Sequence, residues 1–477
     1  MGSSRTIRNI FTKSLVGGLC LGTLAVGARE SYAQETQNFN LNPPQIVQTL
    51  ERAQTPSLEE IAREKEEIQV RILPERRLVI NFDNPVTNSE SNTNAWYSAQ
   101  QVIGKVSDHA GIDWGLDNNL LGRIGILGLQ ASLSEALNMS SHELAHTRTG
   151  KGYGPYKSSF SLKSIDWPRN FSKEFKYVPT LEQRLEEVVA GLNQDELNAF
   201  TLFRYSTLFG NKLNFDEGIA HLQSKFWDVL YNLRSREISG SECNPSQFYR
   251  IGDVSAYICS LNMKGIDFSK KDHLVQALLA DLLSAQTYDS FRAVYEYLRT
   301  GQRSIKPTVF EIKGIAMTPP LISHYLTSNG SFYDIISIMN PNGENPVELN
   351  FGMSVPVKSK PVKTLRIVSD KGKGFRVEEV SEKYEPQYHL RIGAEYHNIR
   401  LGKSENAPRI SPFMYLTMRY DPLRYSGISA GTEFNVPISP RFELTGKADY
   451  SRNDIMENTV KGKNEGFNFS VGLMGRF

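Results

Sequence analysis

Cysteine is scarce in this chain, with three among 477 residues. Cys20 lies in an N-terminal apolar run, which leaves Cys243 and Cys259 in the remainder of the sequence. No C-x-x-C pair or Cys/His cluster is present, so a structural zinc ribbon is excluded. Two cysteines are an even number and lie close enough in sequence to close a short loop. In an oxidising compartment we expect them to form a disulfide; the alternative is two unpaired buried thiols.

The chain also lacks a surplus of charge of either sign. Lys and Arg total 54 against 52 Asp and Glu, for a formal net charge of +2. Domains that bind nucleic-acid phosphates usually carry a clear basic excess. Nucleic acid is therefore not expected among the partners of this protein.

The N-terminus carries an apolar run too short for a membrane anchor. The run extends from Leu15 to Ala28, follows three basic residues and is closed by Arg29. Ser31-Tyr32-Ala33 then provides a small-x-small cleavage site. This order is typical of a secretory signal peptide, so residues 1–33 are predicted to be removed. We expect an exported protein of the periplasm or outer membrane of a Gram-negative bacterium.

The length of the chain exceeds what one hydrophobic core usually serves, so several domains are expected. Apolar residues recur at helical spacing in the first half and at strand spacing in the second. The fold class is predicted to be α+β, with a mainly helical domain followed by an antiparallel, β-rich domain. The predicted division is 34–93 as a polar segment, 94–302 as the helical domain, 303–386 as a strand-rich connection and 387–477 as antiparallel strands.

Three local expectations belong to this division. Ile68–Leu73 and Arg77–Phe82 are predicted to pair as a hairpin. A helix capped by Asp117 or Asn118 is predicted to run to Leu144 as a buried core helix rather than a membrane span. Whether 34–93 acts as a pro-region is open, although its low apolar content favours a linker.

The pattern with the clearest chemistry is Ser140-Ser141-His142-Glu143-Leu144-Ala145-His146. Two imidazoles four residues apart on a helix lie on one face, where both can bind one tetrahedral zinc ion. Glu143 would lie beside the open position and accept a proton from the water that attacks a peptide carbonyl. The sequence is apolar before the motif and polar after it, and we predict that the helix stops at Gly150.

This motif resembles that of the H-E-x-x-H metallopeptidases. The longer H-E-x-x-H-x-x-G-x-x-H form is excluded, because Thr149 and Gly152 stand where that form requires Gly and His. The gluzincin branch takes a Glu ligand from a downstream helix, and Glu187-x-x-Ala190 is similar to its E-x-x-A-D signature. The resemblance therefore implies a zincin-like helical domain, with zinc bound by the two histidines and Glu187.

Other assignments remain open at this stage. Gly191 replaces the Asp that in this signature orients a zinc-bound histidine, and Asp195 is a substitute for it. Glu186 and His221 are alternative third ligands, and His221 is also a candidate stabiliser of the oxyanion. Without a metal, Glu186 and Glu187 would simply belong to a solvated helix face, and His221 would be a core or surface histidine.

The last strands resemble those of outer-membrane β-barrels, which end in alternating apolar residues and a terminal aromatic. Phe469, Val471, Leu473 and Phe477 occupy such places. Strands of about ten residues with one apolar face fit a bilayer-spanning barrel, and a soluble sandwich alternates in the same way. Polar Glu443, Lys447 and Asp449 opposite apolar neighbours favour a barrel, whereas Pro412 and Pro437 inside strands weaken it.

Two functions from different classes follow. The first is an exported zinc endopeptidase that hydrolyses peptide bonds of envelope proteins, with a protein or peptide as substrate and the outer membrane as a partner through the C-terminal strands. The second is a non-catalytic outer-membrane β-barrel or binding protein in which the His142–His146 motif is accidental or degenerate. The sequence defines neither the cleavage preference nor the oligomeric state.

Overall fold

The computed structural model describes most of the chain from residue 76 onward. The described ranges are 76–81, 89–152, 156–159, 172–175, 180–208, 212–235, 243, 252–341, 343–359, 361–370, 374–383, 387–404, 406–419, 424–452 and 466–476. The predicted signal peptide, Ile68–Leu73, Phe477 and most of segment 34–93 lie outside them. Within these ranges no helix is long and apolar enough to cross a membrane.

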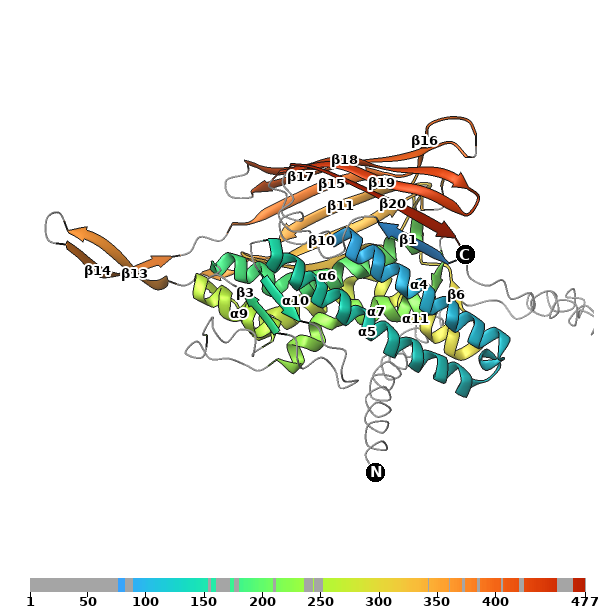
Figure 1. Cartoon of the computed structure of the whole chain (residues 1–477), viewed down its shortest axis with the longest axis horizontal. Coiled ribbons are helices and arrows are strands. Elements are labelled where there is room, and N and C mark those ends of the chain that lie inside the picture. Colours follow the sequence, from blue (N-terminus) through green and yellow to red (C-terminus); the bar gives the residue numbers. More distant parts are fainter. Residues whose placement is uncertain are drawn as a thin grey trace, which may run out of the picture.

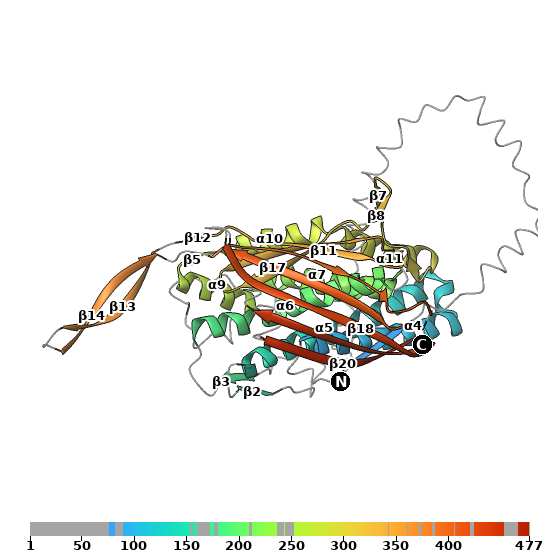
Figure 2. The ribbon, with the colours of Figure 1, turned by 90° about the horizontal axis from the view of Figure 1, so that it is seen from above.

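A layer of helices covers one face of a large antiparallel sheet (Figures 1 and 2). The α-helices are α4 (Ser89–Asp113), α5 (Leu120–Gly152), α6 (Leu181–Leu208), α7 (Phe215–Arg234), α9 (Asp253–Lys264), α10 (Lys270–Leu283) and α11 (Ala285–Thr300). This arrangement confirms the mixed helical and antiparallel class expected from the sequence.

The large sheet combines strands from both ends of the described chain. Its main path runs β1-β20-β19-β18-β17-β15-β11-β10-β8-β7. These strands are β1 (Arg77–Asn81), β7 (Phe310–Ile312), β8 (Ile315–Met317), β10 (Gly330–Met339), β11 (Val347–Ser354), β15 (His389–Tyr396), β17 (Arg409–Arg419), β18 (Arg424–Ser439), β19 (Phe442–Arg452) and β20 (Gly466–Arg476). Beside this path, β9 (Leu321–Thr327) pairs with β10 and β16 (Ile399–Arg400) with β17.

Smaller sheets join other segments. The pairs are β2 (Tyr156–Ser159) with β3 (Ser172–Phe175), β4 (Leu213–Asn214) with β6 (Ser304–Ile305), β5 (Ile266–Asp267) with β12 (Lys358–Ser359), and β13 (Pro361–Asp370) with β14 (Gly374–Lys383). The β13–β14 hairpin projects away from the rest of the molecule (Figure 1).

The expectation of a closed barrel is wrong for the described strands. The sheet ends at β1 on one side and at β7 on the other, and no described pairing joins these two ends. One face of the sheet is also covered by helices rather than enclosing a lumen (Figure 2). The sheet is therefore open.

Two observed pairings join segments that are far apart in the sequence. Arg77–Asn81 forms a strand that pairs with β20 at the opposite end of the chain, whereas its predicted hairpin partner, Ile68–Leu73, lies outside the described residues. Strand β11 from the predicted connection pairs directly with β15 from the predicted C-terminal strands. The sheet thus includes strands from both sides of residue 387. The sequence did not predict these pairings, because pairing between strands far apart in the sequence depends on tertiary packing and leaves no local signal.

Helix α5 begins and ends later than the sequence predicted. Its first turn follows Asn119, whose side chain accepts a hydrogen bond from the Gly122 amide, and it continues to Gly152. The predicted buried core helix is only half realised, because Leu121 and Leu129 are exposed whereas the half around the histidines is buried. The chemistry of the motif therefore lies in the enclosed half of the helix.

A disulfide is part of the hydrophobic core beside the buried half of α5. Leu185, Val189 and Tyr257 belong to a buried apolar cluster formed by α6, α7, α9 and β9. Cys243 and Cys259 form the predicted disulfide, with Cα atoms 5.4 Å apart. Cys259 lies in this cluster, so the disulfide ties the segment before α9 to the core.

A buried ion-pair network fastens the start of the described chain to the helices. The guanidinium of Arg76, which is fully buried, contacts Asp108 of α4 at 3.0 Å and Asp216 of α7 at 2.6 Å. Arg303 contacts Asp108 at 2.6 Å and Asp117 at 2.7 Å. Removing one partner of such a network leaves charges buried without full compensation.

We expect Arg76→Met to lower the free energy of unfolding by about 3–5 kcal/mol, because it leaves the buried Asp216 carboxylate without its guanidinium partner. Urea unfolding provides the measurement. Arg299→Met is the matched control: Arg299 pairs with Glu296 on the surface, where its side chain is 58% exposed, and we expect a change below about 1 kcal/mol. Equal effects of the two substitutions would contradict the structural account of Arg76.

A second buried network joins α7, α10 and β9 around Asp228. Its carboxylate lies 2.9 Å from His273 Nε2 and 3.0 Å from His324 Nδ1. The Asn232 amide donates to His273 Nδ1 at 2.8 Å, which leaves the proton of that ring on Nε2, facing Asp228. Burial alone would raise the pKa of Asp228, but the two histidines outweigh it and hold the pKa below its usual range.

A depressed carboxyl pKa stabilises the fold above the unfolded value of about 3.9, and this stabilisation is lost as the pH falls below it. Between pH 5 and pH 3 we therefore expect the wild type to lose about 1 kcal/mol more unfolding free energy than Asp228→Asn. Urea unfolding at both pH values measures the difference. Identical losses would show that Asp228 does not titrate as described.

Candidate metal centre

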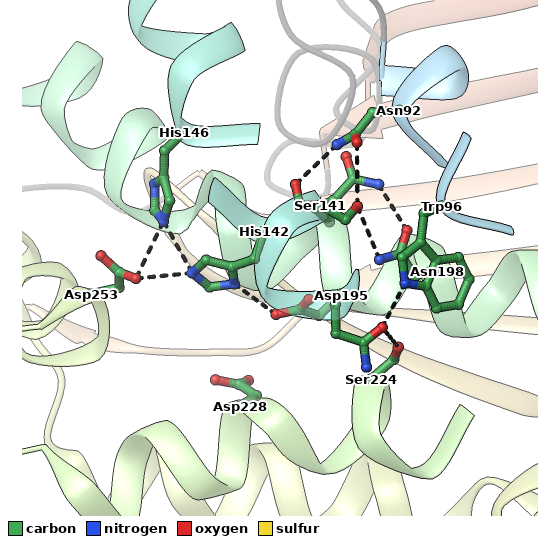
Figure 3. Close-up of polar contacts among 12 residues, drawn as sticks. Asn92, Trp96, Ser141, His142, His146, Asp195, Asn198, Ser224, Asp228 and Asp253 are labelled. Carbon is green, nitrogen blue, oxygen red and sulfur yellow. Dashed lines mark hydrogen bonds and ion pairs between the residues drawn. The ribbon is translucent and has the colours of Figure 1, made fainter. Parts of the chain in front are cut away.

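His142 and His146 lie one turn apart on α5, with both side chains fully buried. Their Nε2 atoms point at each other across 3.1 Å, and the rings meet edge to face. Asp253, the first residue of α9, completes the group from the opposite side (Figure 3). Its Oδ2 lies 3.1 Å from His142 Nε2 and 3.3 Å from His146 Nε2.

The other nitrogen of each ring is held by α6. His142 Nδ1 lies 2.8 Å from Asp195 Oδ2, and His146 Nδ1 lies 2.6 Å from the backbone oxygen of Glu187. A carbonyl or carboxylate oxygen accepts hydrogen bonds, so each Nδ1 is the donor. In the neutral rings, both Nε2 atoms then carry lone pairs that face the centre.

When both rings are neutral, these three inward-facing atoms are all electron-pair donors, and their approach then requires a positive charge between them, which a metal ion or a proton on His142 supplies. Ligands about 2.0–2.1 Å from a tetrahedral zinc ion lie roughly 3.3 Å apart, which is close to the observed separations. His142, His146 and Asp253 are accordingly one of the groups in the described chain whose ligand atoms are close enough to hold a metal ion. Asp195 and the Glu187 carbonyl are oriented as outer supports.

The electrostatic potential at the centre is negative. Burial alone would lower the pKa of His142, but the Asp195 and Asp253 carboxylates outweigh it and raise this pKa to about 10. The same field favours a bound cation. The side chain of Asp253 is 21% exposed, whereas both histidines are fully buried.

Gly191 allows α5 and α6 to approach at this point. A Cβ atom built on Gly191 would lie 2.3 Å from His142 Nε2, closer than real Cβ contacts. Gly191 therefore leaves the space that the imidazole occupies. Asp195, one turn further along α6, makes the hydrogen bond to His142 that the sequence analysis allowed as a substitute.

Two further side chains are relevant to the centre. Glu143 follows His142 directly on α5 and is buried, and its charge acts on Tyr231. Tyr231 of α7 stacks on His142 with ring centroids 5.4 Å apart. Burial, followed by the charges of Asp253, Glu143 and Asp195, raises the pKa of Tyr231, so its phenol stays protonated and is a hydrogen-bond donor near these carboxylates.

The structure does not bring every predicted site residue to this centre. The carboxylate of Glu187 lies on the Nδ1 side of His146, at 3.8 Å, and pairs with Arg184 at 3.2 Å. Glu186 is outside the group. His221 is buried and lies 3.1 Å from Ser290 Oγ on α11, and it too is outside the group. Glu187 therefore supports His146 through its backbone.

Asp253 is the residue that the sequence analysis missed. It follows Gly252, whose φ of 80° is in the left-handed region, and it stands six residues before Cys259 of the disulfide. The signals that could have identified it are its place at a helix start and beside the disulfide. Neither signal links it to a motif more than a hundred residues earlier in the sequence.

The described chain contains two other groups of potential ligands, and both have different explanations. Asp228, His273 and His324 belong to the buried network described above, in which Asp228 hydrogen-bonds His324 and lies 2.9 Å from His273. Glu348, Glu395 and His397 surround Arg204 of α6, whose guanidinium contacts Glu395 and lies 3.4 Å from Glu348. The Arg204 guanidinium thus already provides the positive charge beside these carboxylates. The ion pairs join α6 to the inner face of the sheet.

If Asp195 orients His142, Asp195→Asn should weaken zinc binding by roughly 10- to 100-fold, because the amide no longer accepts the Nδ1 hydrogen with a negative charge. Competition with a chromophoric chelator measures the affinity. Glu186→Gln makes the same kind of change on the same helix and should leave the affinity unaltered. Equal affinity in Asp195→Asn and wild type would remove Asp195 from the centre.

The geometry of these residues is the basis for any functional assignment. No family model, curated protein or solved structure matches the chain in the three comparisons. The chemistry is therefore argued from the residues of this chain, which form a candidate metal centre of two histidines and one aspartate.

Proposed function

We propose that this protein is a zinc-dependent hydrolase of peptide bonds, with His142, His146 and Asp253 as the metal ligands. The observation that carries the proposal is the convergence of the Nε2, Nε2 and Oδ2 atoms within 3.3 Å of one another. Three protein ligands of nitrogen and oxygen type leave a fourth tetrahedral position for water or substrate, as in catalytic zinc sites. A zinc ion bound there would polarise both the water and the peptide carbonyl.

Glu143 is the general base in this proposal. Its position directly after His142 and the effect of its charge on Tyr231, which stacks on His142, support a role in taking a proton from the attacking water. Attack would form the C–O bond and leave a negative charge on the former carbonyl oxygen; the C–N bond would then break as the C=O bond re-forms, and Glu143 would pass the proton to the departing amine. Protonated Tyr231 is suited to donate a hydrogen bond to the oxyanion that develops on the carbonyl.

The substrate and the compartment are part of the same proposal. The disulfide between Cys243 and Cys259 fits an oxidising compartment, and this supports export. An exported peptidase meets envelope proteins as substrates. The other candidate, a binding protein without catalysis, becomes the conclusion if the centre binds no metal.

The test is hydrolysis of an unfolded protein such as reduced casein by the purified full chain. We expect activity that is lost on chelation and restored by about one equivalent of zinc. A chain that binds zinc without hydrolysing any peptide would keep the metal centre and reject the peptidase function. A chain that binds no zinc would reject both.

A further inference from the structure

In the large sheet the polar face is covered by helices and the apolar face is exposed, which is the reverse of the usual arrangement in water-soluble proteins. Its inner face, toward the helices, carries buried charged residues such as Arg391, Glu395 and Asp449. Its outer face carries large apolar side chains in contact with solvent. Exposed examples are Ile80 (47%), Phe351 (41%), Met414 (53%), Ile438 (63%), Phe442 (47%), Phe467 (90%) and Phe469 (67%).

The strand register shows that this outer face is continuous. Directly opposed residues share one face of an antiparallel sheet, so each register row can be followed across neighbouring strands. One row is Leu349, Ala394, Met414, Ala430, Tyr450 and Phe467, on β11, β15, β17, β18, β19 and β20 in turn. The row contains no charged residue, and an apolar surface of this extent usually marks an interaction site.

Aromatic residues and cations lie at both ends of this apolar face. Tyr396 and Phe442 are exposed where β15 ends and β19 begins, and Arg400 of β16 and Arg441 of the turn before β19 are exposed nearby. At the opposite end, Tyr425 and Phe467 are exposed beside Arg424 and Arg452, which are also exposed. Amphipathic aromatics and basic side chains around an apolar surface complement the headgroups and acyl chains of an anionic bilayer.

We propose that the outer face of the sheet docks onto an anionic lipid bilayer, with the sheet lying along the membrane surface and the metal centre held on the opposite, aqueous side. The helices cover the inner face, and a spanning orientation would take their exposed charges, such as Asp113, Lys151 and Asp272, into hydrocarbon. Surface docking leaves these charges in water.

A second copy of the chain suits this surface less well. Two such sheets packed face to face would bury the apolar residues. Because each end of the face carries exposed arginines, a second copy would bring cations toward cations in either orientation. Anionic headgroups complement both ends, so the charge pattern favours lipid.

Co-sedimentation of the full chain with vesicles tests the proposal. We expect binding to vesicles of phosphatidylethanolamine with phosphatidylglycerol, and weaker binding to phosphatidylcholine alone. The double variant Phe467→Asp, Ile438→Asp changes two exposed positions of the face and should weaken binding at least roughly 10-fold. Tyr295→Asp, on α11 and 45% exposed, is the matched control and should bind like the wild type.

The double variant should keep the circular dichroism spectrum and the zinc content of the wild type. These two measurements therefore distinguish a loss of docking from a loss of folding and from a loss of the proposed metal centre. Three results would overturn the proposal: no sedimentation of the wild type with either vesicle type, equal binding of the double variant, or a wild-type dimer in vesicle-free solution that the double variant converts to a monomer. The last result would make the face a surface for self-association.

Discussion

Replacing Glu143 with glutamine should reduce peptide hydrolysis by about 10²- to 10⁴-fold while zinc stays bound. Glutamine has nearly the same shape as glutamate but cannot take a proton from the attacking water. The metal ligands in our proposal are His142, His146 and Asp253, so the substitution removes the base and keeps the centre. Turnover of a peptide with a fluorescent reporter and elemental analysis of the same samples give the two readouts.

Glu135→Gln is the matched control, because it makes the same change on α5 two turns earlier. It should keep both activity and zinc. If Glu143→Gln hydrolysed the peptide as fast as the wild type, Glu143 would not be the base. If the variant lost zinc as well as activity, the result would show that Glu143 holds the metal centre together, contrary to its place outside the ligand group.

Asp253→Ala and Glu187→Gln should have opposite consequences for zinc binding. Loss of Asp253 removes one of three ligands, so we expect the affinity to fall by more than the roughly 10- to 100-fold typical of residues that only orient a ligand. Glu187 contacts His146 Nδ1 at hydrogen-bonding distance through its backbone oxygen, which the substitution preserves. The affinity of Glu187→Gln should therefore change by less than about 10-fold.

Thermal unfolding of both variants after chelation shows whether the fold is retained, since Asp253 lies at the start of α9 near the disulfide. Loss of zinc in Glu187→Gln together with full binding in Asp253→Ala would restore the ligand set that the resemblance to gluzincins implied. Loss in both variants would show that the Glu187 carboxylate moves toward the metal when it binds.

The sequence predicted the strands well where one short segment contained the whole signal. Alternation over Val347–Val355 and over 442–450 corresponds to β11 and β19. Pro412 lies in β17 on the exposed face, and a register irregularity between β18 and β19 follows Pro437, where a residue without an N–H is tolerated. Alternation correctly placed Glu443, Lys447 and Asp449 together on a polar interior face, but it did not indicate that helices cover this face or that the sheet is open.

The candidate site was predictable to the extent that it is local. His142 and His146 share a helical face because of their spacing alone. Asp253 reaches them only through the packing of α9 against α6 and α7, and no spacing rule connects these segments. Gly191 appeared to be a departure from a family signature, whereas the structure shows that it leaves room for the His142 ring.

Zinc stoichiometry of the purified full chain tests the central claim most directly. Elemental analysis of the wild type after dialysis against zinc, beside His146→Ala treated in the same way, requires no knowledge of the substrate. The convergence of His142, His146 and Asp253 leads us to expect about one zinc ion per wild-type chain and a loss of that ion in the variant. A wild type without zinc, or an equal amount of zinc in both proteins, would contradict the proposed metal centre.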